Sequence, residues 1–250
     1  MKALADEIRI VRQESGLSIW RTPLGKLATA DTEIKDHIAF LVAEFQRNVY
    51  LSGPVQVGPS ALVLDVGANI GLFTQQAIRA GARLVICVEP NPASVRALRW
   101  NLAPEIASNR VSIITKGAWH AVDRLPFLVD PKRPGRSSCV VAPPEEAVYE
   151  ISIEVAPLDL MVRELELPRV EFIKMDIEGA ELSALQGASE ILHRYKPQLA
   201  IAVEHTDDRV ANARKVRALV RKLNPRYHCD PGPYVATNTG KPAPDVLYFY

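Results

Sequence analysis

The chain has 250 residues, of which 48% are hydrophobic and 24% are charged, as in soluble globular proteins, so a disordered chain is excluded. Its 30 Lys and Arg nearly balance its 29 Asp and Glu, and the resulting net charge of +1 creates no field that would attract nucleic acid. No apolar run approaches the roughly 20 residues of a membrane helix. The three distant cysteines match neither a disulfide framework nor a zinc site. We therefore expect a cytoplasmic protein with no membrane span and no nucleic-acid partner.

The N-terminal region contains a short strand, a helix and a turn-rich stretch. The strand is expected over 17–20. Asp31 or Thr32 is placed to cap a helix that runs through Asn48, and the apolar face of this helix packs either on its own core or on a second copy in a homodimer. Glycine and proline over 52–60 then mark a boundary.

Apolar runs of strand length alternate with stretches of helical character from residue 61 onwards. This order is the signature of parallel strands joined by right-handed crossovers. The expected strands are 61–66, 84–88, 111–115, 170–175, 198–203 and 246–250, and the expected helices are 72–80, 92–102, 180–194 and 209–223.

A segment rich in proline and charge interrupts this alternation near 124–150, with possible short strands at 125–129 and 138–141. We therefore expect an α/β fold in two parts, an N-terminal appendage over 1–58 and a main domain over 59–250 that carries this insertion. The appendage provides acceptor or dimer contacts in this interpretation.

A loop with two glycines follows the first strand of the main domain and reads Asp65-Val66-Gly67-Ala68-Asn69-Ile70-Gly71. Glycine lets the backbone turn sharply beside a ligand. Glu89, at the end of the next strand, can accept hydrogen bonds from both hydroxyls of a ribose. The loop lacks the G-x-G-x-x-G spacing of NAD sites, and Asp65 would repel a diphosphate but attract a sulfonium and an α-amino group. The sequence therefore favours S-adenosylmethionine over NAD.

Ionisable side chains also gather at the ends of two later strands. Asp176 and Glu178 follow one strand, and Glu204 and His205 follow the next. These strand ends border the crevice in which such sheets bind ligands. Carboxylates beside a histidine suit either general-base catalysis or an oxygen-rich metal site. We expect Asp176 and His205 to act jointly in catalysis, and Asp176, Glu204 and His205 are candidate ligands if Mg²⁺ is required. Glu178 is equally suited to cap the following helix.

Three segments together resemble the FkbM family of S-adenosylmethionine-dependent methyltransferases. They are Val63–Gly71, Val88–Pro92 with Asn101, and Phe172–Glu181, whose Lys-x-Asp-x-Glu-Gly-x-Glu block is the most specific. The resemblance implies a class I methyltransferase fold, with a Rossmann-like, mostly parallel seven-stranded sheet, helices on both faces and an antiparallel last strand. It also implies O-methylation of a hydroxyl on a small molecule, sugar or natural product. Pro157 departs from the threonine that often precedes Leu-Asp in this family.

The resemblance also implies a set of cofactor contacts at the strand ends. Trp119 in this set is equally suited to stack on adenine or to pack in its loop, and Asp65 has the alternative role of capping the loop amides. The expected contacts are Asp65, Gly67, Asn69 and Gly71 to the methionine portion, Glu89 and Asn91 to the ribose, Ala118 and Trp119 to the adenine, and Asp176 near the methyl group.

The insertion carries Lys132, Arg133 and Arg136, which would suit an anionic acceptor if the insertion lies over the crevice as a lid. Two alternative functions stay open: a metal-dependent transferase of the same fold, and a non-catalytic cofactor-binding module. An NAD-dependent oxidoreductase is a third and less favoured alternative.

Overall fold

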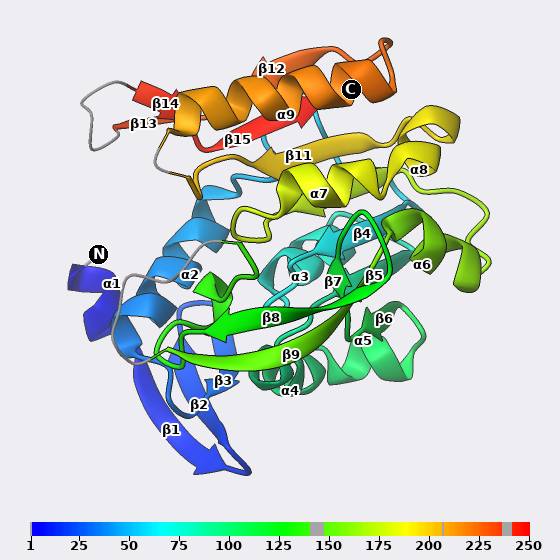
Figure 1. The fold of residues 1–250 in the computed structure, drawn as a ribbon. Helices are drawn as coiled ribbons and strands as arrows, with labels where there is room; N and C mark the ends of the chain where they lie inside the picture. Colours follow the sequence, from blue (N-terminus) through cyan, green and yellow to red (C-terminus); the bar gives the residue numbers. More distant parts are fainter. Residues whose placement is uncertain (1, 141–147, 207, 237–241) are drawn as a thin grey trace.

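The computed structural model describes residues 2–140, 148–206, 208–236 and 242–250 (Figure 1). Its centre is a seven-stranded sheet in the order β12-β15-β11-β10-β4-β5-β6. The strands from β11 to β6 pair in parallel, whereas β15 is antiparallel to both of its neighbours, as expected for a class I methyltransferase fold. The strands are β4 (Leu62–Val66), β5 (Leu84–Val88), β6 (Val111–Ile114), β10 (Phe172–Met175), β11 (Gln198–Ala202), β12 (Cys229–Pro231) and β15 (Val246–Phe249).

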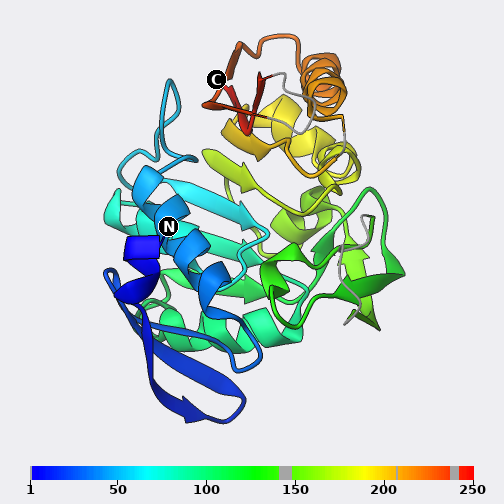
Figure 2. The ribbon, with the colours of Figure 1, turned by 90° about the vertical axis from the view of Figure 1, so that its left-hand side faces the viewer.

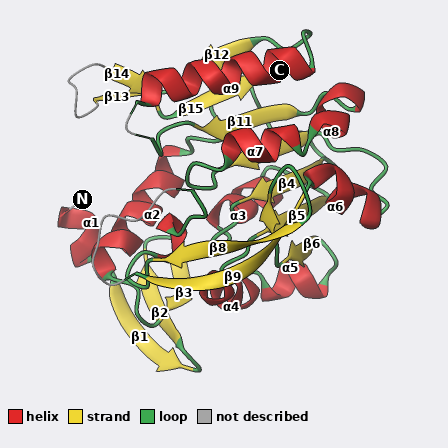
Figure 3. Cartoon of the chain, viewed as in Figure 1, coloured by secondary structure: helices red, strands yellow, loops and turns green. Residues whose placement is uncertain are grey.

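Helices cover both faces of this sheet (Figure 3). Alternate strand residues point to opposite faces, so Leu64 and Val66 pack in the core beneath α6 to α9, and Val63 packs in the core beneath α3 to α5. No helix in the described ranges is long and apolar enough to cross a membrane. The helices are α3 (Leu72–Arg79), α4 (Pro92–Asn101), α5 (Ala103–Ala107), α6 (Leu158–Glu164), α7 (Glu181–Gln186), α8 (Ser189–Arg194) and α9 (Arg209–Leu223).

The single helix expected over 180–194 is two helices, α7 and α8. The chain passes very close to a neighbouring loop between them, because a Cβ on Gly187 would lie 2.0 Å from the carbonyl oxygen of Trp119. The carboxylate of Asp159 accepts hydrogen bonds from the backbone N–H groups of Glu190 and Ile191 and so satisfies the first turn of α8. Asp159 of the Pro-Leu-Asp segment therefore stabilises the N-terminal end of α8.

The N-terminal region folds as a three-stranded antiparallel sheet followed by a long helix (Figure 2). The expected strand at 17–20 lies within the middle strand of that sheet. The expected cap was wrong: Ile34 is the N-cap residue of α2 without a side-chain hydrogen bond, and the hydroxyl of Thr32 donates instead to the carbonyl of Pro131. The elements are α1 (Lys2–Asp6), β1 (Arg9–Glu14), β2 (Leu17–Thr22), β3 (Gly25–Ala30) and α2 (Lys35–Arg47).

This region shares a core with the main domain. Ile38 on the apolar face of α2 packs in one buried cluster with Ile70 of the glycine loop and Ala97 of α4. The side chain of Asn101 accepts a hydrogen bond from Ala28 N–H at 2.7 Å and donates to the carbonyls of Ala28 and Ile70, both at 2.9 Å. Residues of the N-terminal region and of the main domain therefore both hold the glycine loop in place. The domain boundary near residue 58 stays a prediction.

The insertion contributes to a second small sheet in the order β7-β9-β8. The expected strand at 125–129 lies within β8, but Ser138 forms only an isolated bridge to Leu128, because the chain turns there through the 3₁₀ helix η1. Residue 141, the end of the other expected strand, lies outside the described residues. The remaining elements are β7 (Gly117–Ala118), β8 (Asp123–Val129), η1 (Pro134–Arg136), β9 (Tyr149–Ala156), β13 (Tyr234–Ala236) and β14 (Pro242–Pro244).

The loop after β4 requires glycine at its first turn. Gly67 has a φ of 79°, and a Cβ on it would lie 1.8 Å from the carbonyl oxygen of Asp176 at the end of β10. We expect Gly67→Ala to lower the free energy of unfolding by at least about 2 kcal/mol, because it combines left-handed strain with a backbone clash. Denaturant unfolding measures this. Gly58→Ala is the matched control, since a Cβ there meets nothing within 4 Å; equal losses in both variants would contradict the geometry.

Candidate active site

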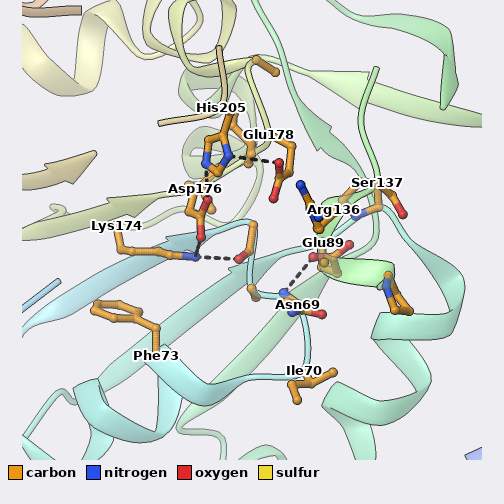
Figure 4. A pocket seen from close by; sticks show the side chains of 18 of the residues that line it. Asn69, Ile70, Phe73, Glu89, Arg136, Ser137, Lys174, Asp176, Glu178 and His205 are labelled. Carbon is orange, nitrogen blue, oxygen red and sulfur yellow. Dashed lines mark hydrogen bonds and ion pairs between the residues drawn. The ribbon is translucent and has the colours of Figure 1, made fainter. Parts of the chain in front are cut away.

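A cavity of about 860 Å³ lies at the carboxyl ends of the central parallel strands. This volume is within the roughly 300–1,000 Å³ of small-molecule sites. Its floor is the glycine loop, and its walls come in part from the insertion around η1 and from the residues that follow β10 and β11 (Figure 4). Residues of α2 complete the wall. Three parts of the sequence thus build one pocket.

Two of the expected loop residues line this cavity. Gly67 and Asn69 lie on its surface, and the insertion packs directly on Asn69, because a Cβ on Gly135 would lie 2.6 Å from its amide nitrogen. Gly71 does not line the cavity. It has a φ of 91° and packs against Leu98 of α4, so its role is to let the helix approach the loop.

Asp65 is placed differently from the expectation that it contacts a ligand. It is fully buried and does not line the cavity. Its carboxylate accepts a hydrogen bond from the hydroxyl of Thr74 at 2.7 Å and forms an ion pair with Lys174 at 3.3 Å. Lys174 also donates to the carbonyl of Gly67 at 2.7 Å. Asp65 therefore lies beneath the glycine loop and stabilises the loop indirectly, by pairing with the lysine that donates to Gly67.

Glu89 lies at the expected place, at the end of β5, and lines the cavity. Its two carboxylate oxygens accept hydrogen bonds from the backbone N–H groups of Asn69 and Asn91, each at 2.8 Å. Burial raises the pKa of Glu89 to about 7, although these two hydrogen bonds lower it. Each oxygen keeps further lone pairs for other donors.

Of the other expected contacts, Ala118 and Trp119 line the cavity and Asn91 does not. The side chain of Asn91 caps α4 by accepting a hydrogen bond from the N–H of Ala93, and its amide faces the carbonyl of Pro134 in the insertion. Asn91 therefore orients Glu89 and the insertion without itself reaching the pocket. The ring of Trp119 lies near that of His120, with centroids 5.3 Å apart.

Asp176 is the centre of a network of donors. One of its oxygens accepts a hydrogen bond from the hydroxyl of Tyr50 at 2.9 Å and lies 3.8 Å from Lys174, and the other accepts from Nε2 of His205 at 2.8 Å (Figure 4). Burial tends to raise the pKa of Asp176, but Lys174 and His205 together hold it well below its usual range. Asp176 is therefore an ionised carboxylate on the cavity wall.

His205 is held between two carboxylates. Its Nδ1 lies 3.0 Å from Glu178, opposite the bond to Asp176. Burial lowers the pKa of His205, but these two hydrogen bonds raise it well above its usual value, so both ring nitrogens carry protons. The joint action of Asp176 and His205 in catalysis stays a prediction, and a protonated His205 would serve in it as a hydrogen-bond donor to Asp176. Glu178 faces His205 and does not cap α7.

The same three residues offer donor atoms for a metal ion. Atoms of Asp176, Glu178 and His205 lie within 4.8 Å of one another. Glu204, which was expected in this set, lies instead 3.6 Å from Arg209. A cation would have to displace the protons through which His205 joins its two carboxylates. The donor types suit a divalent ion, but their present hydrogen bonding satisfies them without one.

The sequence indicated acceptor or dimer contacts from the N-terminal region but did not identify which of its residues line the pocket. Tyr50 and several residues of α2 line the cavity, among them His37, Phe40 and Glu44. The only signal was the amphipathic spacing of the helix, which does not reveal what the helix covers. Among the basic residues of the insertion, Arg133 and Arg136 line the cavity, whereas Lys132 does not.

The chain matches known methyltransferases in sequence and in fold. It is 30% identical over 159 residues to methyltransferase sdnD of Sordaria araneosa, covering 51% of this chain and 60% of that protein. It is 25% identical over 174 residues to methyltransferase 1 of Beauveria bassiana, covering 61% of this chain and 70% of that protein.

The methyltransferase FkbM of Methylobacillus flagellatus superposes with a TM-score of 0.58 at 23% identity over 89% of this chain and 56% of its own. The chain thus spans about 60% of the length of its first curated relative. The model of the methyltransferase FkbM domain matches residues 65–227, and the chain therefore belongs to the FkbM methyltransferase family.

Proposed function

We propose that the protein transfers a methyl group from S-adenosylmethionine to a hydroxyl of a small molecule. The observation that carries this proposal is that one cavity joins the carboxylate of Glu89 at the end of β5 to the ionised carboxylate of Asp176 at the end of β10. Both acids face the same pocket across the Gly67 loop.

In this proposal the donor is held on the side of β5. Glu89 accepts hydrogen bonds from the ribose hydroxyls, Gly67 and Asn69 border the methionine portion, and Ala118 with Trp119 borders the adenine. When bound, S-adenosylmethionine supplies a methyl group on a positively charged sulfur. The negative charge of Asp176, which its three donors preserve, favours a cation in this part of the cavity.

The protein contributes mainly alignment and charge. Holding the hydroxyl, the methyl group and the sulfur in line can contribute several kcal/mol, up to about 7–11 kcal/mol in ideal intramolecular models. The insertion supports this alignment, because Ser138 donates to the carbonyl of Glu178 at 2.6 Å and the N–H of Ile34 donates to Lys132, which fixes the insertion over the pocket.

The acceptor in this proposal is a small hydroxylated molecule and not nucleic acid. The cavity volume limits its size, and Arg133 and Arg136 on the insertion provide positive charge for an acidic group on it. A homodimer and a cytoplasmic location stay proposals that the fold neither requires nor contradicts.

A second candidate is methyl transfer that depends on Mg²⁺, favoured by the close donor atoms of Asp176, Glu178 and His205. These residues would hold the ion, which would polarise the acceptor hydroxyl. The protons shared within the cluster oppose this reading, because a metal ligand must give up its proton.

The contact to Glu89 is tested by calorimetric titration with S-adenosylhomocysteine. We expect Glu89→Ala to weaken binding of S-adenosylhomocysteine about 10- to 100-fold. The variant loses the hydrogen bonds from the ribose hydroxyls to the carboxylate, and it also loses the acceptor that holds the N–H of Asn69. Glu164→Ala, an exposed acid on α6, serves as the control and retains full affinity. Undiminished affinity in Glu89→Ala would place the donor elsewhere.

Transfer itself is tested with S-adenosylmethionine labelled in its methyl group and three hydroxylated probes, namely catechol, methyl glucoside and 3-hydroxybutyrate. We expect labelled ether product from at least one probe, at an unchanged rate after exhaustive treatment with EDTA. Activity that disappears with EDTA and returns with Mg²⁺ would favour the metal-dependent reading. A protein that binds S-adenosylhomocysteine but methylates none of the probes would be a binding module, contrary to the proposal.

A further inference from the structure

We propose that Glu44 is the general base that accepts the proton of the acceptor hydroxyl. This inference rests on the proposed methyl transfer and deepens it. Glu44 lies on α2 outside the segment that matches the family model, and its side chain lines the cavity. Neither the glycine loop nor the Lys-x-Asp-x-Glu-Gly-x-Glu block contains it.

Four other carboxylates that line the cavity are engaged by protein donors, and a fifth, Asp36 in the first turn of α2, is exposed to solvent. Asp176 accepts from Tyr50 and His205, and Glu178 is paired with His205. Glu89 accepts from two backbone N–H groups, and Glu204 lies 3.6 Å from Arg209. Glu44 has no hydrogen bond or ion pair with any residue that the structure describes. Its oxygens are therefore available to a ligand, which is the first requirement of a base.

His37 is the other basic side chain on the same helix face. Its Nδ1 lies 2.7 Å from the buried carboxylate of Glu33, and its ring lies near Gly135 of the insertion, which packs on Asn69. Seven residues along a helix correspond to about 10 Å. Glu44 thus lies two turns away from His37 on this face, within the electrostatic influence of Asp176, and His37 lies near the part of the insertion that packs on the donor loop.

Charged groups from several elements face Glu44. Burial and the negative charge of Asp176 raise the pKa of Glu44, whereas Lys174, Arg47 and His205 lower it, and together these effects place it at about 7. The hydroxyl of Tyr50 also lies in the field of Glu44. An acid with a pKa near neutrality combines a useful ionised fraction with adequate basicity, as general-base catalysis requires.

In one turnover, a lone pair of the hydroxyl oxygen forms a bond to the methyl carbon while the carbon–sulfur bond breaks and its electron pair stays on sulfur. The hydroxyl proton passes to the carboxylate of Glu44 and then to solvent. The products are the methyl ether, S-adenosylhomocysteine and one proton, so no further reactant is needed.

Glu44→Gln tests this role, because glutamine keeps the size of the side chain and removes its basicity. With the probe that the wild-type protein methylates, we expect kcat to fall about 10²- to 10⁴-fold. The affinity for S-adenosylhomocysteine and the melting temperature are expected to stay unchanged. Glu190→Gln, an exposed acid on α8, is the matched control and keeps wild-type turnover. Glu44→Asp retains a carboxylate and is expected to recover part of the lost rate.

The pH profile provides a second measurement. A base must be ionised, so kcat/KM of the wild-type protein rises with pH through about 7 and then levels off, and this rise is absent in Glu44→Gln. The proposal is overturned if Glu44→Gln keeps the wild-type kcat, whether or not it weakens binding of S-adenosylhomocysteine. It is also overturned if His37→Gln abolishes turnover while Glu44→Gln does not. If the wild-type protein methylates none of the probes, the proposed function fails and the role of Glu44 falls with it.

Discussion

The buried ammonium group of Lys174 is the interaction on which the site depends. It lies 3.3 Å from Asp65 and 3.8 Å from Asp176, and it donates to the carbonyl of Gly67 at 2.7 Å. Burial lowers the pKa of this lysine, but the two carboxylates raise it overall, so the charge persists inside the protein. One cation thereby ties β4, its loop and β10 together. Removing Lys174 would leave the buried carboxylate of Asp65 without a counter-charge, which explains why a lysine is buried at the floor of the pocket.

The pocket is completed by segments that lie far from this floor in sequence. Asn101 links the glycine loop to β3, and the contact between Ile34 and Lys132 links the start of α2 to the insertion. Because both links are hydrogen bonds to the backbone, the side chains that face the cavity from α2 and from the insertion can vary without loss of the scaffold. The floor of the cavity is thus built from the sheet, and part of its wall from α2 and the insertion.

The sequence predicted the parallel sheet well because its strands are continuous apolar runs. The ends of each expected central strand differ by at most two residues from those of an observed strand. The strand β12 was not predicted, because Cys229–Pro231 is not an apolar run. Glu89 and Asp176 were found because strand ends converge in this fold. The side-chain partners of Asp65 and His205 were not predicted, since they come from other strands: Lys174 pairs with Asp65, and two carboxylates pair with His205. Charge pairing of this kind has no signature in spacing.

Two carboxylates of the same pocket are therefore prepared for different tasks by their surroundings. Asp176 receives hydrogen bonds from Tyr50 and His205 and lies near a buried lysine, so it stays ionised and retains its negative charge. Glu44 is largely removed from water, receives no donor from the described residues and faces that negative charge, so its proton affinity rises. Chemically similar groups acquire separate pKa values when burial and neighbours differ, which is how one site can combine a fixed charge with a proton acceptor. The electrostatic difference between the two acids thus arises from both parts of the chain, because Lys174 and His205 of the main domain lower the pKa of Asp176, whereas Glu44 comes from the N-terminal region.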